Sequence, residues 1–348
     1  MRVLFLTLYP EAAASPRYRV HQFLPWLRAH GFDCTVKATL SEAAWRRHSG
    51  PERQGRAFWY HARETPQRLG QLLGAGSYDA VFLQKAITSA YVHGYDRILR
   101  ARAKRLIYDI DDAVHLAPPH PLRMPWRLLE DRAQVDRIMG QANLVLAGNR
   151  WLVAGAEARG GRAAYFPTVV DTDRFVPAAR PPERFCAGWM GAPSTAGALG
   201  AIGPALEALG SDELIVAGAN AGQVHWPSAR IEPWRYDTEV QLLQQFSVGL
   251  MPLPRDAWTQ GKCALKALLY MSVGIPCIAT PYGAVRDIIR HGENGWFAET
   301  ADEWCSAIEV LRDPALCQRL GEAARATVEA HFSLRNAAPI LARHLEGV

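Results

Sequence analysis

The chain has 348 residues, of which 49% are hydrophobic and 21% are charged, and its formal net charge is +5. This length exceeds one typical domain, and the composition is that of a globular chain that can bury two cores. No apolar run approaches the roughly 20 residues of a membrane-spanning helix, and the run near the start has the length of a strand, too short for a signal peptide. We therefore expect a cytoplasmic protein, with peripheral contact at the inner membrane face as an option.

The first half of the chain alternates short apolar runs with helical stretches. Strands are expected at residues 3–8, 34–36, 80–83, 106–110, 144–147 and 163–166. Such alternation predicts a parallel, doubly wound sheet. A proline-rich stretch without an apolar period, 177–184, predicts a linker.

The turn after the first strand carries a helix start and two cations. Ser15 is expected to be the N-cap and Pro16 the first helical residue. Arg17 and Arg19 then lie in the first turn, at the carboxyl end of a strand, where open sheets bind ligands. Arginine suits phosphate or carboxylate, although an ion pair with a carboxylate of the protein is the alternative.

An acidic cluster ends the strand expected at 106–110. Asp109, Asp111 and Asp112 are followed by His115. One interpretation is a Mg or Mn site that holds a diphosphate. The other places Asp111 or Asp112 against a substrate hydroxyl, as hydrogen-bond acceptor or base, with His115 nearby.

The second half repeats the alternation after the linker. Strands are expected at 186–190, 214–216, 229–231, 248–251 and 277–280, with helices over 303–332 and 336–345. Gly191 follows the first of these strands and allows close backbone approach, and Ser194 can cap a helix or touch a phosphate.

The segment 246–297 is the most informative part of the chain. A basic turn with Gly261 and Lys262 precedes a helix expected at 263–273, which Gly274 and Pro276 end. A strand, a turn at Gly283 and a tight reversal at 294–295 follow. A helix N-terminus beside a lysine favours an anion.

This segment resembles the donor-binding region of GT-B glycosyltransferases of the retaining GT4 type, and the resemblance covers most of the chain. It implies an α/β GT-B fold, with two Rossmann-like doubly wound domains facing an interdomain cleft. The domains would be an acceptor-binding one at 1–176 and a nucleotide-sugar-binding one at 185–331, with a C-terminal helix at 332–348 packing back on the first.

The resemblance also implies roles for residues. The donor diphosphate would be bound by Arg17, Arg19, Gly191, Ser194, Lys262 and Lys266. The donor sugar or nucleotide would lie against Gly261, Leu269, Gly283, Ala284 and Val285. Catalysis would involve Asp111, Asp112 and His115. No metal and no cofactor is expected, because GT-B enzymes generally hold the diphosphate with cations and helix dipoles.

The sequence departs from the family at two glutamates. In the family seven residues lie between them, and the matching positions here are Gly261 and Leu269. Lys262 and Lys266 are interpreted as substitutes. We expect transfer of a sugar from a nucleoside diphosphate sugar to a hydroxyl, with retention. The alternatives are a catalytically degenerate binding or partner subunit and a sugar-nucleotide epimerase. A nicotinamide dehydrogenase is disfavoured because no G-x-G-x-x-G follows the first strand.

The expected partners are the nucleotide sugar and a glycan, lipid-linked or small-molecule acceptor. The segment 43–71 interleaves arginines with Trp45, Phe58, Trp59 and Tyr60, which suits either an amphipathic helix with a solvated arginine face or a membrane surface. No nucleic-acid-binding motif is present, and nucleic acid is not expected as a partner. The six cysteines lack a C-x-x-C spacing and are expected to be reduced packing residues.

Overall fold

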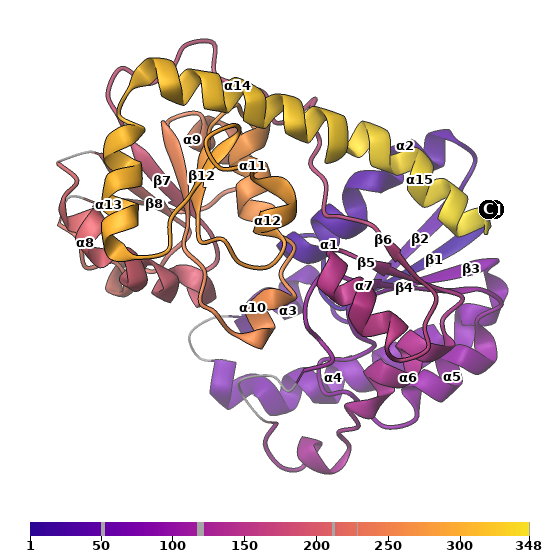
Figure 1. The fold of residues 1–348 in the computed structure, drawn as a ribbon. Coiled ribbons are helices and arrows are strands. Elements are labelled where there is room, and N and C mark those ends of the chain that lie inside the picture. Colours follow the sequence, from indigo (N-terminus) through magenta and orange to yellow (C-terminus); the bar gives the residue numbers. More distant parts are fainter. Residues whose placement is uncertain (50–52, 117–121, 211–212, 228, 348) are drawn as a thin grey trace. The chain divides into compact units, whose positions relative to one another are not determined.

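The structure, a computed structural model, describes residues 1–49, 53–116, 122–210, 213–227 and 229–347 (Figure 1). The chain divides into two compact units, which are described separately. The first unit comprises Met1–Thr168, Gly261–Cys263 and Ala337–Val348. The second comprises Val169–Gln260 and Ala264–Asn336.

The first unit is built on a six-stranded parallel sheet of order β2-β1-β3-β4-β5-β6. Its strands are β1 (Arg2–Thr7), β2 (Asp33–Ala38), β3 (Ala80–Gln84), β4 (Leu106–Ile110), β5 (Leu144–Ala147) and β6 (Ala163–Tyr165). Every residue of β3, β4 and β5 is buried. This burial on both faces explains why their sequences are continuous apolar runs without alternation, as predicted.

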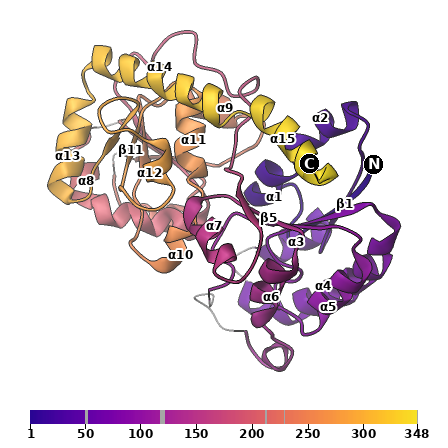
Figure 2. The ribbon, with the colours of Figure 1, turned by 45° about the vertical axis from the view of Figure 1, so that its right-hand side comes forward.

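Helices cover both faces of this sheet. They are α1 (Ala14–Arg19), α2 (Leu24–Ala29), α3 (Glu42–Ser49), α4 (Arg53–Leu73), α5 (Tyr95–Arg102), α6 (Ala133–Gln141), α7 (Arg150–Glu157) and α15 (Leu334–Glu346), with short 3₁₀ turns η1 (His21–Phe23), η2 (Gly74–Ser77) and η3 (Trp126–Leu128). In both views α4, α5 and α6 lie on one face, and α1, α2 and α15 lie on the other (Figure 1, Figure 2). The change of face follows from the reversal of strand order between β1 and β3.

Two sequence predictions about this unit are wrong. Ser15 is not an N-cap: α1 begins at Ala14, its N-cap is Ala13, and no side chain caps it. Arg68 does not belong to a solvated arginine face, because it is completely buried and donates hydrogen bonds to the carbonyl oxygens of Thr7 and Ile87.

The second unit has its own six-stranded parallel sheet, of order β12-β11-β10-β7-β8-β9. Its strands are β7 (Ala187–Met190), β8 (Leu214–Ala217), β9 (Ala229–Glu232), β10 (Val248–Met251), β11 (Cys277–Ala279) and β12 (Gly295–Phe297). The predicted reversal at 294–295 leads into β12, which pairs in parallel with β11. The two doubly wound sheets confirm the predicted fold class.

The helical elements of the second unit are short before β11 and long after β12. They are η4 (Pro193–Ile202), α8 (Gly203–Glu207), η5 (Ala221–Gln223), α9 (Glu239–Leu243), α10 (Ala257–Gln260), α11 (Leu265–Ser272), α12 (Val285–Ile288), α13 (Ala301–Val310) and α14 (Pro314–His331). No helix in the described residues is both long and apolar enough to cross a bilayer.

Candidate active site

Each sheet has a point where the strand order reverses, and ligands of open α/β sheets bind there, outside the carboxyl ends of the strands. In the first unit this point lies between β1 and β3. In the second it lies between β7 and β10. Most of the predicted site residues follow one of these strands or their neighbours.

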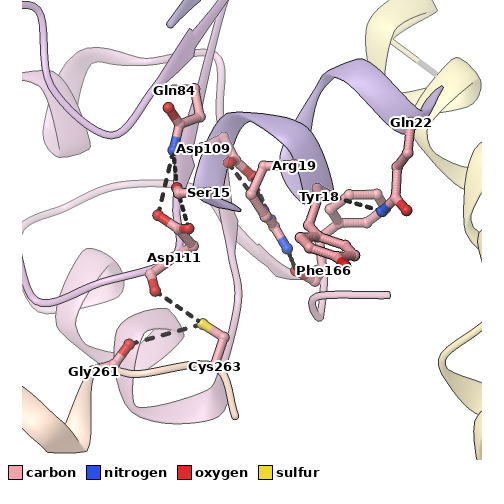
Figure 3. A network of polar contacts seen from close by, with 10 residues as sticks. All are labelled: Ser15, Tyr18, Arg19, Gln22, Gln84, Asp109, Asp111, Phe166, Gly261 and Cys263. Carbon is pink, nitrogen blue, oxygen red and sulfur yellow. Dashed lines mark hydrogen bonds and ion pairs between the residues drawn. The ribbon is translucent and has the colours of Figure 1, made fainter. Parts of the chain in front are cut away.

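Asp111 lies beside the reversal point of the first unit, where two side chains hold its carboxylate (Figure 3). Ser15 Oγ donates a hydrogen bond to Asp111 Oδ2. Gln84 Nε2 donates to Ser15 Oγ at 2.6 Å and to Asp111 Oδ1 at 3.4 Å. The carboxylate is half-buried. It is therefore oriented by α1 and by the end of β3, and it keeps lone pairs for a further donor.

Asp112 forms an ion pair with Lys85, which the sequence did not reveal as a site residue. Lys85 Nζ lies 3.0 Å from Asp112 Oδ2. Burial would raise the pKa of Asp112, but Lys85 and Lys262 outweigh burial and lower it. Lys85 also has a left-handed backbone, with φ of 72°. Such strain in a residue that is not glycine clusters at functional sites, and the sequence carries no signal of it.

The structure gives no support for the predicted contact between Arg19 and a diphosphate. Its side chain is 1% exposed, and its Nε lies 3.1 Å from Asp109 Oδ2, while Nη1 donates to Phe166 O at 2.9 Å. Burial alone would lower the pKa of Arg19, but the charge and hydrogen bonds of Asp109 outweigh burial and raise it. The ion pair joins α1 to β4, so we assign Arg19 to holding the site together. The alternative of an ion pair within the protein holds for this arginine.

The metal interpretation of the acidic cluster gains no support. Asp109 bonds to Arg19, Asp111 to Ser15 and Gln84, and Asp112 to Lys85. Among the residues that the structure describes, no three His, Cys, Asp or Glu side chains are grouped so that they could hold a metal ion.

His115 lies in the loop that follows Asp111 and Asp112, and it packs on α7. Its ring centroid is 5.2 Å from that of Trp151. Burial, followed by the charge of Arg159, lowers the pKa of His115, so the ring is neutral at pH 7. Its Nδ1 is buried and has no hydrogen-bond partner within the described residues.

The turn Gly261–Cys263 belongs to the first unit, although the residues on both sides of it belong to the second. Cys263 Sγ donates to Asp111 O at 3.3 Å, and Asn149 Nδ2 donates to Lys262 O at 3.1 Å. A Cβ on Gly261 would lie 2.6 Å from the backbone nitrogen of Ala113, so only glycine fits there. The structure thus brings this turn to the backbone of Asp111 and the charge of Lys262 close enough to act on Asp112.

Arg17 is buried on α1. Its guanidinium carbon lies 5.5 Å from the centre of the Tyr18 ring. Because the side chain is largely covered, the structure adds no support for contact with a diphosphate.

In the second unit, Gly191 and Lys266 come together at the reversal point. A Cβ on Gly191 would lie 2.6 Å from Lys266 Cε and 2.7 Å from the Trp189 ring. Lys266 Nζ lies 5.4 Å from the centre of that ring. Ser194 is exposed near the start of η4. The turn after β7 and the start of α11 therefore share one small region with a full positive charge.

The residues predicted to contact the sugar or nucleotide are mostly apolar and covered. Leu269 is 6% exposed within α11, and Ala284 and Val285 are buried where α12 begins. Gly283 has a left-handed backbone, with φ of 61°. Only the backbone groups of these residues could bind a polar ligand.

One known family matches part of the chain. Residues 199–313 match the family described as "Glycosyl transferases group 1". A stretch of 101 residues is 37% identical to N-acetyl-alpha-D-glucosaminyl L-malate synthase of Bacillus anthracis. That stretch is 28% of this chain and 25% of the relative, so the match spans only a quarter of the relative's length.

Solved structures resemble the whole chain. HepE of Anabaena, in complex with UDP-glucose, has a TM-score of 0.73 at 15% identity over 100% of both chains. Sucrose-phosphate synthase of Thermosynechococcus elongatus has a TM-score of 0.73 at 14% identity, covering 99% of this chain and 98% of that one. At these identities the likeness establishes the fold. The chain therefore has the GT-B fold, and its segment 199–313 is similar to the group 1 glycosyl transferases.

Proposed function

We propose that this chain is a glycosyltransferase that moves a sugar from a UDP-sugar to an acceptor hydroxyl, with retention of anomeric configuration and without a metal or cofactor. The observation that carries the proposal is the pairing of Gly191 with Lys266 at the reversal point of the second sheet, within a GT-B fold. UDP is chosen because HepE, which shares the fold, is described with UDP and with UDP-glucose.

The donor diphosphate would bind beside Gly191. Because residue 191 has no side chain, Lys266 can lie directly over the backbone of this turn, where it supplies a full positive charge for a diphosphate. Ser194, exposed at the start of η4, would donate a hydrogen bond to a phosphate oxygen. Charge that develops on the leaving diphosphate is stabilised best by such preorganised groups.

The acceptor hydroxyl would bind at Asp111. Ser15 and Gln84 fix the direction of its carboxylate, while the neighbouring Asp112 forms an ion pair with Lys85. An incoming hydroxyl would donate its hydrogen bond to Asp111 and be oriented for attack on the sugar. Lys262, whose charge acts on Asp112, would add positive charge beside the bound acceptor. Retention is inferred from the GT4 resemblance.

Turnover tests this proposal. The protein is incubated with UDP-glucose or UDP-N-acetylglucosamine and a set of acceptors that spans glycans, a lipid-linked alcohol and hydroxy acids, in buffer containing EDTA. We expect release of UDP only with a suitable acceptor and a product with the donor's anomeric configuration by NMR. Lys266→Ala should lose this activity, whereas Lys104→Ala, a change of an exposed lysine, should keep it.

Three results would contradict the proposal. Conversion of donor alone to another nucleotide sugar would indicate an epimerase. Binding of UDP with no transfer to any acceptor class would indicate a binding subunit. Activity that EDTA removes and Mg²⁺ restores would contradict the metal-independent part.

A further inference from the structure

The first unit exposes a group of large apolar side chains that its sheet and site do not use. On α4, Phe58 is 46% and Trp59 is 62% exposed. Around η3, Met124 is 63%, Leu128 is 73% and Leu129 is 45% exposed. Together with the arginines named below we call this group the aromatic–arginine surface. Exposed apolar groups gathered in this way mark an interaction site.

Ring contacts join α4 to η3, so these side chains form one surface. The ring centroids of Phe58 and Trp126 are 5.8 Å apart, and those of His61 and Trp126 are 5.4 Å apart. His61 is buried and its Nδ1 lies 3.1 Å from Ser89 Oγ. The surface is therefore supported from below by packed residues.

The exposed charged side chains of the segments 58–73 and 122–129 are all arginines. Arg63, Arg123 and Arg127 are exposed within the segments 58–73 and 122–129. The carboxylate in those segments, Glu64, is fully buried and accepts a hydrogen bond from Ser89 N at 2.9 Å. Exposed arginines in the same segments as protruding apolar groups complement an anionic surface.

The same charges argue against a second copy as the occupant. In a two-fold symmetric contact the surface would face itself, and its arginines would meet arginines with no exposed carboxylate from these segments to pair with. A lipid bilayer with anionic headgroups accepts both features, because tryptophan and leucine enter the interface while arginine stays at the headgroups.

We propose that the aromatic–arginine surface docks the first unit on an anionic lipid bilayer. The exposed residues within 58–73 of α4 and 122–129 around η3 form the contact, and no helix in the part of the chain that the structure describes crosses the membrane. The proposal does not depend on the proposed function, since it concerns binding to lipid and not transfer of a sugar.

Co-sedimentation with vesicles tests it. The full chain is mixed with vesicles of phosphatidylcholine containing phosphatidylglycerol, and with vesicles of phosphatidylcholine alone. We expect binding to the anionic vesicles that weakens as salt is added. Arg123→Gln with Arg127→Gln should weaken the partition coefficient by about fivefold for each arginine. Trp59→Ala with Leu128→Ala should weaken it at every salt concentration.

Matched changes on the second unit control for general effects of charge and hydrophobicity. Arg235→Gln and Ile231→Ala alter an exposed arginine and an exposed isoleucine there, and both should leave binding unchanged. Thermal unfolding confirms that each variant is folded. The proposal fails if the wild type does not sediment with anionic vesicles, or if the control variants lose as much binding as the surface variants. It also fails if the wild type is a dimer in solution that Trp59→Ala converts to a monomer.

Discussion

At the scale of single residues, the site depends on pairs of polar side chains that no local sequence pattern predicts. Arg19 and Asp109 are 90 positions apart in the sequence, and Ser15 and Asp111 are 96 apart. The sequence indicated that charged groups follow strands β1 and β4, and the structure confirms that they do. Which of them bond to one another depends on strand order and side-chain reach, which could not be predicted from residue types.

The Ser15–Asp111 bond leads to the first prediction. Asp111→Asn should lower the turnover number by about a hundredfold, because the amide no longer offers a carboxylate to the hydroxyl. Ser15→Ala should have a smaller effect on turnover, since Gln84 still contacts Asp111. Steady-state kinetics measure both, with Asp302→Asn on the second unit as the control. Full activity of Asp111→Asn would contradict the assignment.

Arg68 gives a prediction about stability. Burial lowers the pKa of Arg68 to about 10, so it is still charged at pH 7. Arg68→Met should lower the free energy of unfolding by about 3 kcal/mol, because the buried carbonyl of Ile87 loses its donor and that of Thr7 keeps only the N–H of Thr39. Chemical denaturation measures the loss. The exposed Arg102→Met should change stability little, and equal effects of the two changes would contradict this account.

His115 gives a prediction about pH. Burial lowers its pKa in the folded protein below the usual value, so the unfolded chain binds the proton more tightly. The stability from the neutral ring is present above a pH of about 6.5 and is lost as the pH falls towards the lowered folded pKa. The melting temperature of His115→Gln should therefore fall less between neutral and acidic pH than that of the wild type. The exposed His225→Gln should behave like the wild type, and an unaltered profile for His115→Gln would exclude this contribution.

At the scale of elements, the strands could be predicted and the turns only in part. Apolar runs such as 106–110 and 144–147 match β4 and β5, because strands buried on both faces have a continuous apolar sequence. The two positions where the family carries glutamates have changed in different ways. Leu269 has joined the core of the second unit, and Gly261 lets its backbone approach Ala113.

A substitution of Gly191 tests whether the turn after β7 belongs to the donor site. Gly191→Ala should displace Lys266 and the Trp189 ring, because the added Cβ would lie within 2.7 Å of both. We expect UDP affinity to fall about tenfold, which corresponds to about 1.4 kcal/mol. Calorimetric titration measures the change, and Gly197→Ala in η4, where a Cβ meets nothing within 4 Å, is the control. Unchanged affinity in Gly191→Ala would remove this turn from the donor site.

At the scale of the whole molecule, the chain repeats one architecture in two units of different sequence. Each sheet reverses its strand order once; Asp111, which the sequence assigned to catalysis, lies beside the first reversal point, and Gly191, which it assigned to the donor, follows β7 at the second. The sequence did not indicate that Gly261–Cys263 would belong to the first unit. The local residue pattern of this turn predicts a phosphate site. The position of the turn in the fold is decided by its packing against Ala113 and Asn149.

Calorimetric titration with UDP, GDP, ADP and TDP is the measurement that tests the central claim most directly. The account predicts selective binding of UDP in the presence of EDTA, which Lys266→Ala abolishes and Lys104→Ala leaves intact. Absence of binding to every nucleotide, or equal binding of UDP by Lys266→Ala and the wild type, would contradict the assignment of the donor site.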